Sequence, residues 1–138
     1  MYKITFPLKK VNVVAVQNIL RKEGKMFMPC LTSNPYTIQG CTDASVYYKG
    51  ATTIDFQLEI QSNPAGAPIS YKANLQFYNT NTSTWQTLQV KSGTFTRITS
   101  LFSYELSSKP QGTYRIKVDF TMTGASFSAQ TSNFYVYK

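Results

Sequence analysis

The chain has 138 residues and a mass of 15.6 kDa, with 42% apolar residues, only 14% charged residues and a formal net charge of +8. This length is enough for one hydrophobic core and too short for two domains of typical size. The absence of His excludes Ser-His-Asp and Cys-His catalytic groups and His-ligated zinc.

The basic charge is concentrated at the N-terminus. Residues 1–28 hold six basic residues and one acidic residue, a net charge of +5, whereas residues 29–138 hold eight basic and five acidic residues, a net charge of +3. A basic arm can bind phosphates or anionic lipid, but a solvated, mobile terminus explains the same charge. We divide the chain into a basic arm over 1–28 and a domain over 29–138, and expect no nucleic-acid partner.

Within the arm, the run YKITF is typical of a strand, and VNVVAVQNIL fits either a strand or a short helix. The longest apolar run is interrupted by three amide side chains and falls far short of the ~20 residues of a membrane span. A signal peptide fits poorly, because Arg21–Lys25 stands where a small-residue cleavage site should be. Met26 or Met28 is an alternative start, because RKEGKMFM is what a purine-rich ribosome-binding sequence would encode.

The two cysteines, Cys30 and Cys41, allow one intrachain disulfide. Asn34-Pro35 and Gln39-Gly40 between them are turn signals, so the two cysteines could face each other across a bent or paired segment. Such a bond would indicate an exported protein. Two unrelated buried thiols are the alternative, because a free Cys behaves as a small hydrophobic residue.

From about residue 35 onward, apolar and polar residues alternate. The segments TTIDFQLEIQ and ISYKANLQFYN each place apolar residues on one face, and SNPAGAP between them predicts a turn. In the first segment, Asp55 and Glu59 are expected on a solvated face. A hairpin is predicted around Asn79–Thr84, and KSG at 91–93 is expected to end its second strand.

Short strands are then expected at Phe95–Ile98 and Leu101–Leu106. Alternation returns in GTYRIKVDFTM, and TGAS leads into a last strand over roughly Phe127–Tyr137. About seven strands with regular turn signals and no convincing helix predict an all-β fold, an immunoglobulin-like antiparallel β-sandwich with a basic N-terminal arm.

The segment PQGTYRIKV resembles the E–F corner of immunoglobulin-like domains, in which a Tyr hydroxyl returns to the backbone upstream. Tyr114 would be the corner residue, and Ile116 stands where antibody domains have a disulfide Cys. The segments YTIQG, TTIDFQLEIQ, LQFYNTNTSTWQTL and GTYRIKVDF also resemble small secreted immunoglobulin-like proteins of Gram-positive bacteria. That resemblance implies an architecture and no functional residue.

Several kinds of site are not expected. The chain has no GxGxxG motif and no P-loop, and no loop offers more than one carboxylate for calcium, so we expect no cofactor and no metal. Asp55 and Glu59 would lie about 13 Å apart on one strand, beyond the ~6.5–9.5 Å between the carboxylates of inverting glycosidases. We therefore expect no enzyme.

Binding is the function class that remains. In immunoglobulin-like sandwiches the third and sixth strands are neighbours. If the segments ISYKANLQFYN and GTYRIKVDFTM are these two strands, Lys72 and Tyr78 lie beside Arg115 and Lys117. This basic, amide-rich face could bind an anionic glycan, a wall polymer or an acidic protein surface, or could simply be solvated. Trp85 either stacks on a sugar or packs at the core edge.

The C-terminal run SNFYVYK is expected to form an exposed sheet edge, so self-association by strand addition is possible, with YKITF as the donor. We expect a non-enzymatic binding or adhesion domain outside the cell or in the cell envelope. The alternative is a structural subunit of a filament or virion that assembles through its N-terminal arm.

Overall fold

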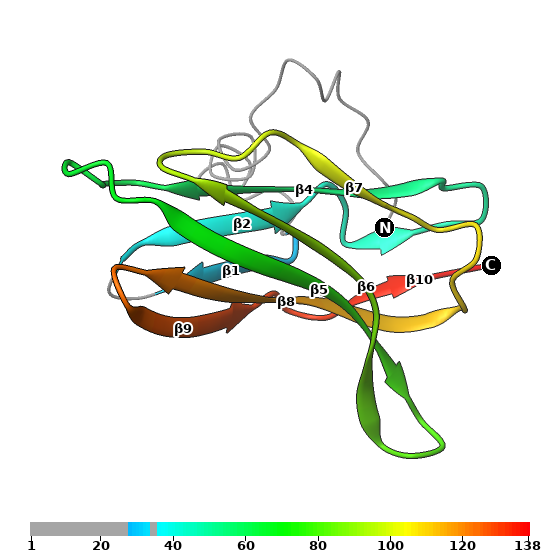
Figure 1. The fold of residues 1–138 in the computed structure, drawn as a ribbon. Helices are drawn as coiled ribbons and strands as arrows, with labels where there is room; N and C mark the ends of the chain where they lie inside the picture. Colours follow the sequence, from blue (N-terminus) through cyan, green and yellow to red (C-terminus); the bar gives the residue numbers. More distant parts are fainter. Residues whose placement is uncertain (1–27, 34–35) are drawn as a thin grey trace.

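The computed structural model describes residues 28–33 and 36–138, and the predictions for YKITF and VNVVAVQNIL lie outside these ranges. Every regular element in the described ranges is a strand, so none of them contains a helix that could cross a membrane. The strands, shown in Figure 1, are β1 (Cys30–Ser33), β2 (Ile38–Thr42), β3 (Val46–Tyr47), β4 (Thr53–Ile60), β5 (Ile69–Asn79), β6 (Thr84–Phe95), β7 (Phe102–Glu105), β8 (Gly112–Met122), β9 (Ala125–Gln130) and β10 (Phe134–Val136).

These strands form two sheets. The first has the order β1-β2-β4-β7, and the second has the order β3-β10-β8-β5-β6, with β9 paired to β8 beside β10. Only the pair β10–β3 is parallel among the described strands. The all-β sandwich prediction is confirmed, but the described residues form ten strands (Figure 1). Strands β1 to β3 were not foreseen, the last strand divides into β9 and β10, and the strand expected at Phe95–Ile98 is missing.

The core lies between the sheets and follows the predicted alternation on β5 and β8. Ile69, Ala73 and Leu75 of β5 are fully buried, as are the alternate residues of β8 from Tyr114 to Val118. Each large apolar side chain buried in this way stabilises the fold by roughly 1.5–3 kcal/mol. The intervening residues of both strands therefore face solvent together.

Tyr114 forms the predicted corner. Its hydroxyl donates a hydrogen bond of 2.5 Å to the carbonyl oxygen of Pro110, four residues upstream. Its ring packs 5.3 Å from that of Phe77 on the neighbouring strand β5. The corner thus joins the turn before β8 to the core.

Cys30 and Cys41 lie directly opposite each other on the antiparallel strands β1 and β2, with their Cα atoms 4.1 Å apart. A disulfide joins them. Of the two alternatives drawn from the sequence, the structure has the bonded pair. The division into an arm over 1–28 and a domain over 29–138 stays a prediction, because residues 1–27 lie outside the described ranges.

Strand β4 does not have the solvated face that its alternation predicted. Asp55 and Gln57 are both buried. Asp55 Oδ1 accepts a 2.5 Å hydrogen bond from Ser103 Oγ, and Gln57 Nε2 donates to the Thr99 carbonyl oxygen at 2.9 Å. The expectation was wrong because Ser103 and Thr99, more than forty residues away, each form one hydrogen bond with these side chains, which offsets part of the cost of burying them.

Strand β6 does not end at Lys91-Ser92-Gly93 but continues to Phe95. At Gly93, an added Cβ would lie 2.9 Å from the hydroxyl oxygen of Tyr71. Tyr71 lies opposite Gly93 on β5, so this glycine provides room for the tyrosine rather than a turn. The expected separate strand at Phe95–Ile98 is accordingly absent from this described segment.

The C-terminal strand is not a sheet edge. Strand β10 lies between β8 and β3, and its Tyr135 and Val136 pair with residues of both. The ends of the strand order are β3 and β6 instead. The prediction of an exposed C-terminal edge is therefore wrong, whereas self-association by strand addition stays a prediction.

Candidate binding face

The solvent side of the second sheet carries most of the side chains that the sequence singled out. We define the outer face as the solvent-facing residues of β5, β6, β8 and β9. Strands β5 and β8 are paired so that Lys72 lies opposite Asp119, Asn74 opposite Lys117, and Gln76 opposite Arg115. The expected adjacency of these two strands is confirmed.

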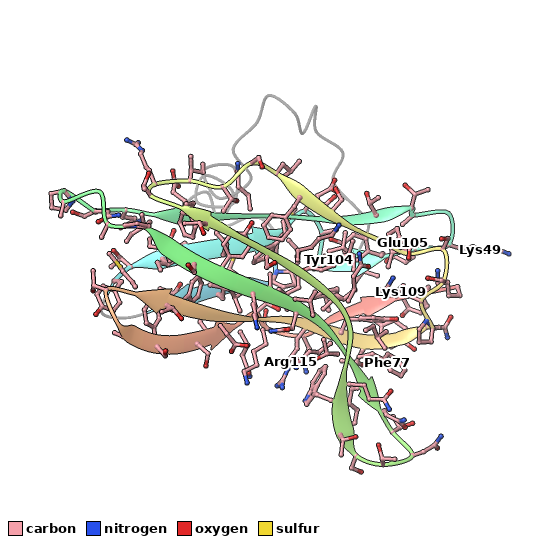
Figure 2. The ribbon with its side chains drawn as sticks, viewed as in Figure 1. Lys49, Phe77, Tyr104, Glu105, Lys109 and Arg115 are labelled. Atoms are coloured by element: carbon pink, nitrogen blue, oxygen red, sulfur yellow. A yellow bond between two sulfur atoms is a disulfide. The ribbon has the colours of Figure 1, made fainter. Side chains whose placement is uncertain are left out.

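Arg115 is held in place on this face by two contacts. Its Nε donates a 2.7 Å hydrogen bond to Gln76 Oε1, and its Cζ lies 4.2 Å from the centroid of the Trp85 ring (Figure 2 labels Arg115). Partial burial lowers the pKa of Arg115 from its usual value. A guanidinium nevertheless remains charged at neutral pH, so Trp85 orients a cation here.

Trp85 lies beside the turn of the β5–β6 hairpin. Its only described ring partner is Tyr78, directly opposite on β5, at 5.2 Å with an edge-to-face angle of 62°. The side chain is partly exposed and does not belong to the hydrophobic core. The core-edge interpretation of Trp85 is therefore wrong. Tyr78, Trp85 and Arg115 form one cluster at the hairpin end of the outer face.

The middle of the face is cationic. The Asn74 amide donates to the Lys117 carbonyl oxygen at 2.9 Å and to Asp119 Oδ2 at 3.2 Å, so an amide partly satisfies the one carboxylate here. Neither Lys72 nor Lys117 forms an ion pair with any residue that the structure describes. Three cations thus share this surface with a single carboxylate, Asp119.

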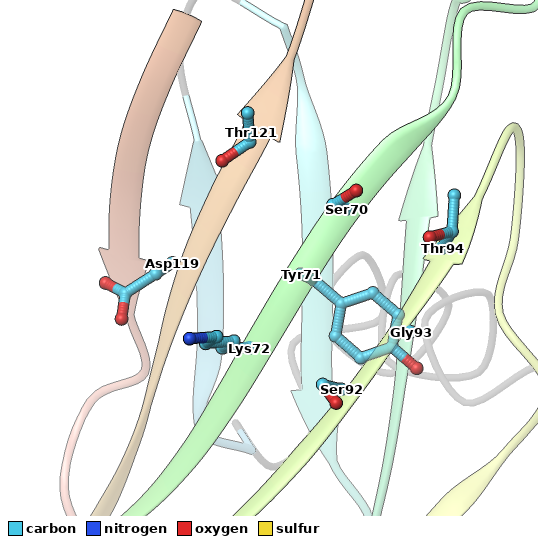
Figure 3. Close-up of a pocket in the computed structure, with 8 residues that line it drawn as sticks. All are labelled: Ser70, Tyr71, Lys72, Ser92, Gly93, Thr94, Asp119 and Thr121. Atoms are coloured by element: carbon cyan, nitrogen blue, oxygen red, sulfur yellow. The ribbon is translucent and has the colours of Figure 1, made fainter. Parts of the chain in front are cut away.

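A hollow of about 560 Å³ opens at the other end of the outer face, and Figure 3 shows its lining. Four of the lining residues are Ser or Thr, and Lys72 and Asp119 supply a charge of each sign. Tyr71 passes beneath β6 at Gly93, where its ring packs on Phe95 and Phe102 of the interior. The lining residues are Ser70, Tyr71, Lys72, Ser92, Gly93, Thr94, Asp119 and Thr121.

Sequence reasoning missed two polar features. The first is this hydroxyl-lined hollow, whose only signal was a Ser or Thr at alternate positions of three strands. The second is a buried group in which Asp43 Oδ1 accepts hydrogen bonds from the Tyr47 hydroxyl at 2.5 Å and from the Asp55 backbone N–H at 3.1 Å. Burial and the nearby Asp43 raise the pKa of Tyr47 well above its usual value.

The buried group fits a structural role. Asp43 and Asp55 are almost fully inaccessible, and each accepts hydrogen bonds from neighbouring strands or loops. Over residues 28–33 and 36–138, no group of three or more His, Cys, Asp or Glu side chains could hold a metal ion. The outer face is therefore the candidate functional surface of the described region.

Comparisons with known proteins give a family and a fold. A family model described as the YqgA MG2 macroglobulin domain matches residues 29–137. Among solved structures, the PmoD soluble domain from Methylocystis sp. ATCC 49242 (Rockwell) has a TM-score of 0.50 and 15% sequence identity, covering 80% of this chain and 98% of that one. Identity this low shows the fold alone. A search of curated proteins found no match.

Proposed function

The chain belongs to the YqgA MG2 macroglobulin domain family, and from that premise we propose that it is a non-catalytic binding module that takes an anionic partner on its outer face. Macroglobulin domains of this type are generally immunoglobulin-like modules without catalytic activity. The Cys30–Cys41 disulfide supports a place outside the cytoplasm, in the cell envelope or the extracellular space, because disulfides persist in oxidising compartments.

The observation that carries the proposal is the charge of the outer face. Lys72, Lys117 and Arg115 lie on adjacent strands, and only Asp119 opposes them there. Cations that have no carboxylate paired with them attract a polyanion over several ångströms and speed its association. A sheet face suits an extended polymer or a broad protein surface better than a small enclosed ligand.

The alternative of a filament or virion subunit depends on the arm over residues 1–28, almost all of which lies outside the described ranges. No contact among residues 28–33 and 36–138 favours it. The outer face, by contrast, is built from strands with defined register, so its role can be tested directly.

The experiment measures retention on immobilised polygalacturonate, a polyanion that carries carboxylates and hydroxyls. The variant Lys72→Gln/Lys117→Gln removes two charges from the outer face, and the control Lys49→Gln/Arg97→Gln removes two exposed charges elsewhere; Figure 2 shows Lys49 on the loop after β3. Two exposed ionic contacts contribute roughly 1.4 kcal/mol together, a tenfold change in Kd.

We expect the outer-face variant to bind about tenfold more weakly than the wild type, with binding that falls as salt is added, and the control to bind as the wild type does. Equal losses in both variants would show that only net charge matters. Absence of retention of the wild type by any polyanion would remove the proposed function.

A further inference from the structure

The outer face carries a row of hydroxyls that runs across four strands. Ser126 of β9 lies opposite Thr121 of β8, Thr121 opposite Ser70 of β5, and Ser70 opposite Thr94 of β6. With strands about 4.8 Å apart, the row extends over roughly 14 Å. All four side chains are exposed, and none donates or accepts a side-chain hydrogen bond with another described residue.

The next row across the same strands adds charge. It consists of Ser128, Asp119, Lys72 and Ser92, in that order from β9 to β6. The hollow lies between the two rows over β8, β5 and β6, as Figure 3 shows. Its volume of about 560 Å³ is within the ~300–1,000 Å³ of small-molecule sites, so it can take one cyclic unit of a larger ligand.

The lining is complementary to a sugar ring. A Ser or Thr hydroxyl both donates and accepts hydrogen bonds, a carboxylate only accepts, and an ammonium only donates. A sugar ring presents several hydroxyls at once, each of which needs both kinds of partner. An acidic peptide presents carboxylates but few hydroxyls, so the cations would bind it and the row of Ser and Thr would not contribute.

The hollow is also close to the cationic part of the face. Lys72 belongs both to the hollow and to the cationic part. Gln76 follows Lys72 by four residues on β5, a distance of about 13 Å along the strand, and Arg115 lies opposite Gln76. A polymer with one ring in the hollow therefore reaches Lys117 and Arg115 with its following units.

We propose that the partner of the outer face is an anionic polysaccharide, with a sugar ring in the hollow formed by Ser70, Thr94 and Thr121 and with its anionic groups on Lys72, Lys117 and Arg115. This inference rests on the proposed function and names its ligand class. It assigns the hydroxyls to recognition of sugar and the cations to recognition of charge.

The test separates the two roles with two probes. Polygalacturonate carries hydroxyls and carboxylates, whereas inorganic polyphosphate carries charge without sugar hydroxyls. The variant Ser70→Ala/Thr94→Val/Thr121→Val removes three hydroxyls of the hollow and keeps every charge. The control Thr52→Val/Thr80→Val/Ser100→Ala removes three exposed hydroxyls outside the outer face.

We expect the hollow variant to lose about tenfold in affinity for polygalacturonate and to stay within about twofold of the wild type for polyphosphate. A circular dichroism spectrum equal to that of the wild type shows that the variant is folded. The Lys72→Gln/Lys117→Gln variant should lose affinity for both probes. The control should match the wild type for both.

Unchanged binding of polygalacturonate by the hollow variant would overturn this inference and leave the proposed function standing. Binding of poly-glutamate at least as tight as that of polygalacturonate would overturn it too, in favour of an acidic protein partner. If the wild type binds none of the three polyanions, the proposed function itself fails.

Discussion

The guanidinium carbon of Arg115 lies 4.2 Å from the centroid of the Trp85 ring, and Trp85 is the single tryptophan of the chain. Intrinsic tryptophan fluorescence therefore reports on the surroundings of this one ring, which are formed by Arg115 and Tyr78. The contact joins β8 to β6 across β5, so it also records whether the outer face is assembled.

We expect Arg115→Gln to shift the emission of Trp85, because the change removes the cation from the ring face. Lys117→Gln, on the same strand, removes a charge that does not contact the ring and should leave the spectrum unchanged. An exposed cation–π contact contributes roughly 0.5–1 kcal/mol, and the hydrogen bond from Arg115 to Gln76 is lost as well, so the free energy of unfolding should fall by about 1–2 kcal/mol. Identical spectra for both variants would show that Arg115 does not contact the ring in solution.

The corner hydroxyl of Tyr114 gives a stability prediction. Tyr114→Phe removes the hydrogen bond to the Pro110 carbonyl oxygen and keeps the buried ring. We expect the free energy of unfolding in urea to fall by about 1–1.5 kcal/mol. Tyr135→Phe on β10 is the control, and should change it by less than about 0.5 kcal/mol. An equal fall in the free energy of unfolding for both substitutions would show that the hydrogen bond from Tyr114 to Pro110 does not stabilise the fold.

Buried tyrosines predict a loss of stability at alkaline pH. Burial raises the pKa of Tyr104, with a further contribution from Tyr71, and burial with Asp43 and Asp55 raises that of Tyr47. Above the unfolded pKa of about 10, the unfolded chain loses these protons while the folded chain keeps them. The unfolded state then binds fewer protons, so the free energy of unfolding falls as pH rises, by up to about 1.4 kcal/mol per pH unit for each such tyrosine.

The measurement is urea unfolding at a series of pH values from 8 to 11.5. Tyr104→Phe loses the 2.7 Å hydrogen bond to the Ala73 carbonyl oxygen and is less stable throughout. Above pH 10, the free energy of unfolding of this variant should nevertheless fall less steeply with pH than that of the wild type, by about 1.4 kcal/mol per pH unit, because one tyrosine proton no longer titrates. A slope equal to that of the wild type would show that Tyr104 ionises in the folded state.

The local pattern was enough to predict the strands whose two faces differ. On β5 and β8, alternation separated buried Leu75 and Ile116 from Lys72 and Arg115, and the Ig-like corner at Tyr114 followed from its neighbours in sequence. The pairing of β5 with β8 followed from the fold class. These features gave the cationic part of the candidate site.

The remaining features depend on contacts between distant segments. Asp55 is buried because Ser103 bonds to it, and Gly93 continues a strand because Tyr71 occupies the space beside it. The hydroxyl row requires the register of four strands at once, and a shift of one residue would turn Ser70 or Thr121 to the other face. Alternation within a single strand does not contain that information.

The bond between Cys30 and Cys41 determines how the domain bears tension. A pull on the chain ahead of Cys30 passes through the two sulfur atoms to Cys41, so residues 31–40 carry none of the load. The load enters the sheet at β2, which has hydrogen-bonded neighbours on both sides, instead of peeling away the terminal strand β1. If the domain is tethered by its N-terminal side, the tension thus acts on the interior strand β2 for as long as the disulfide stays intact.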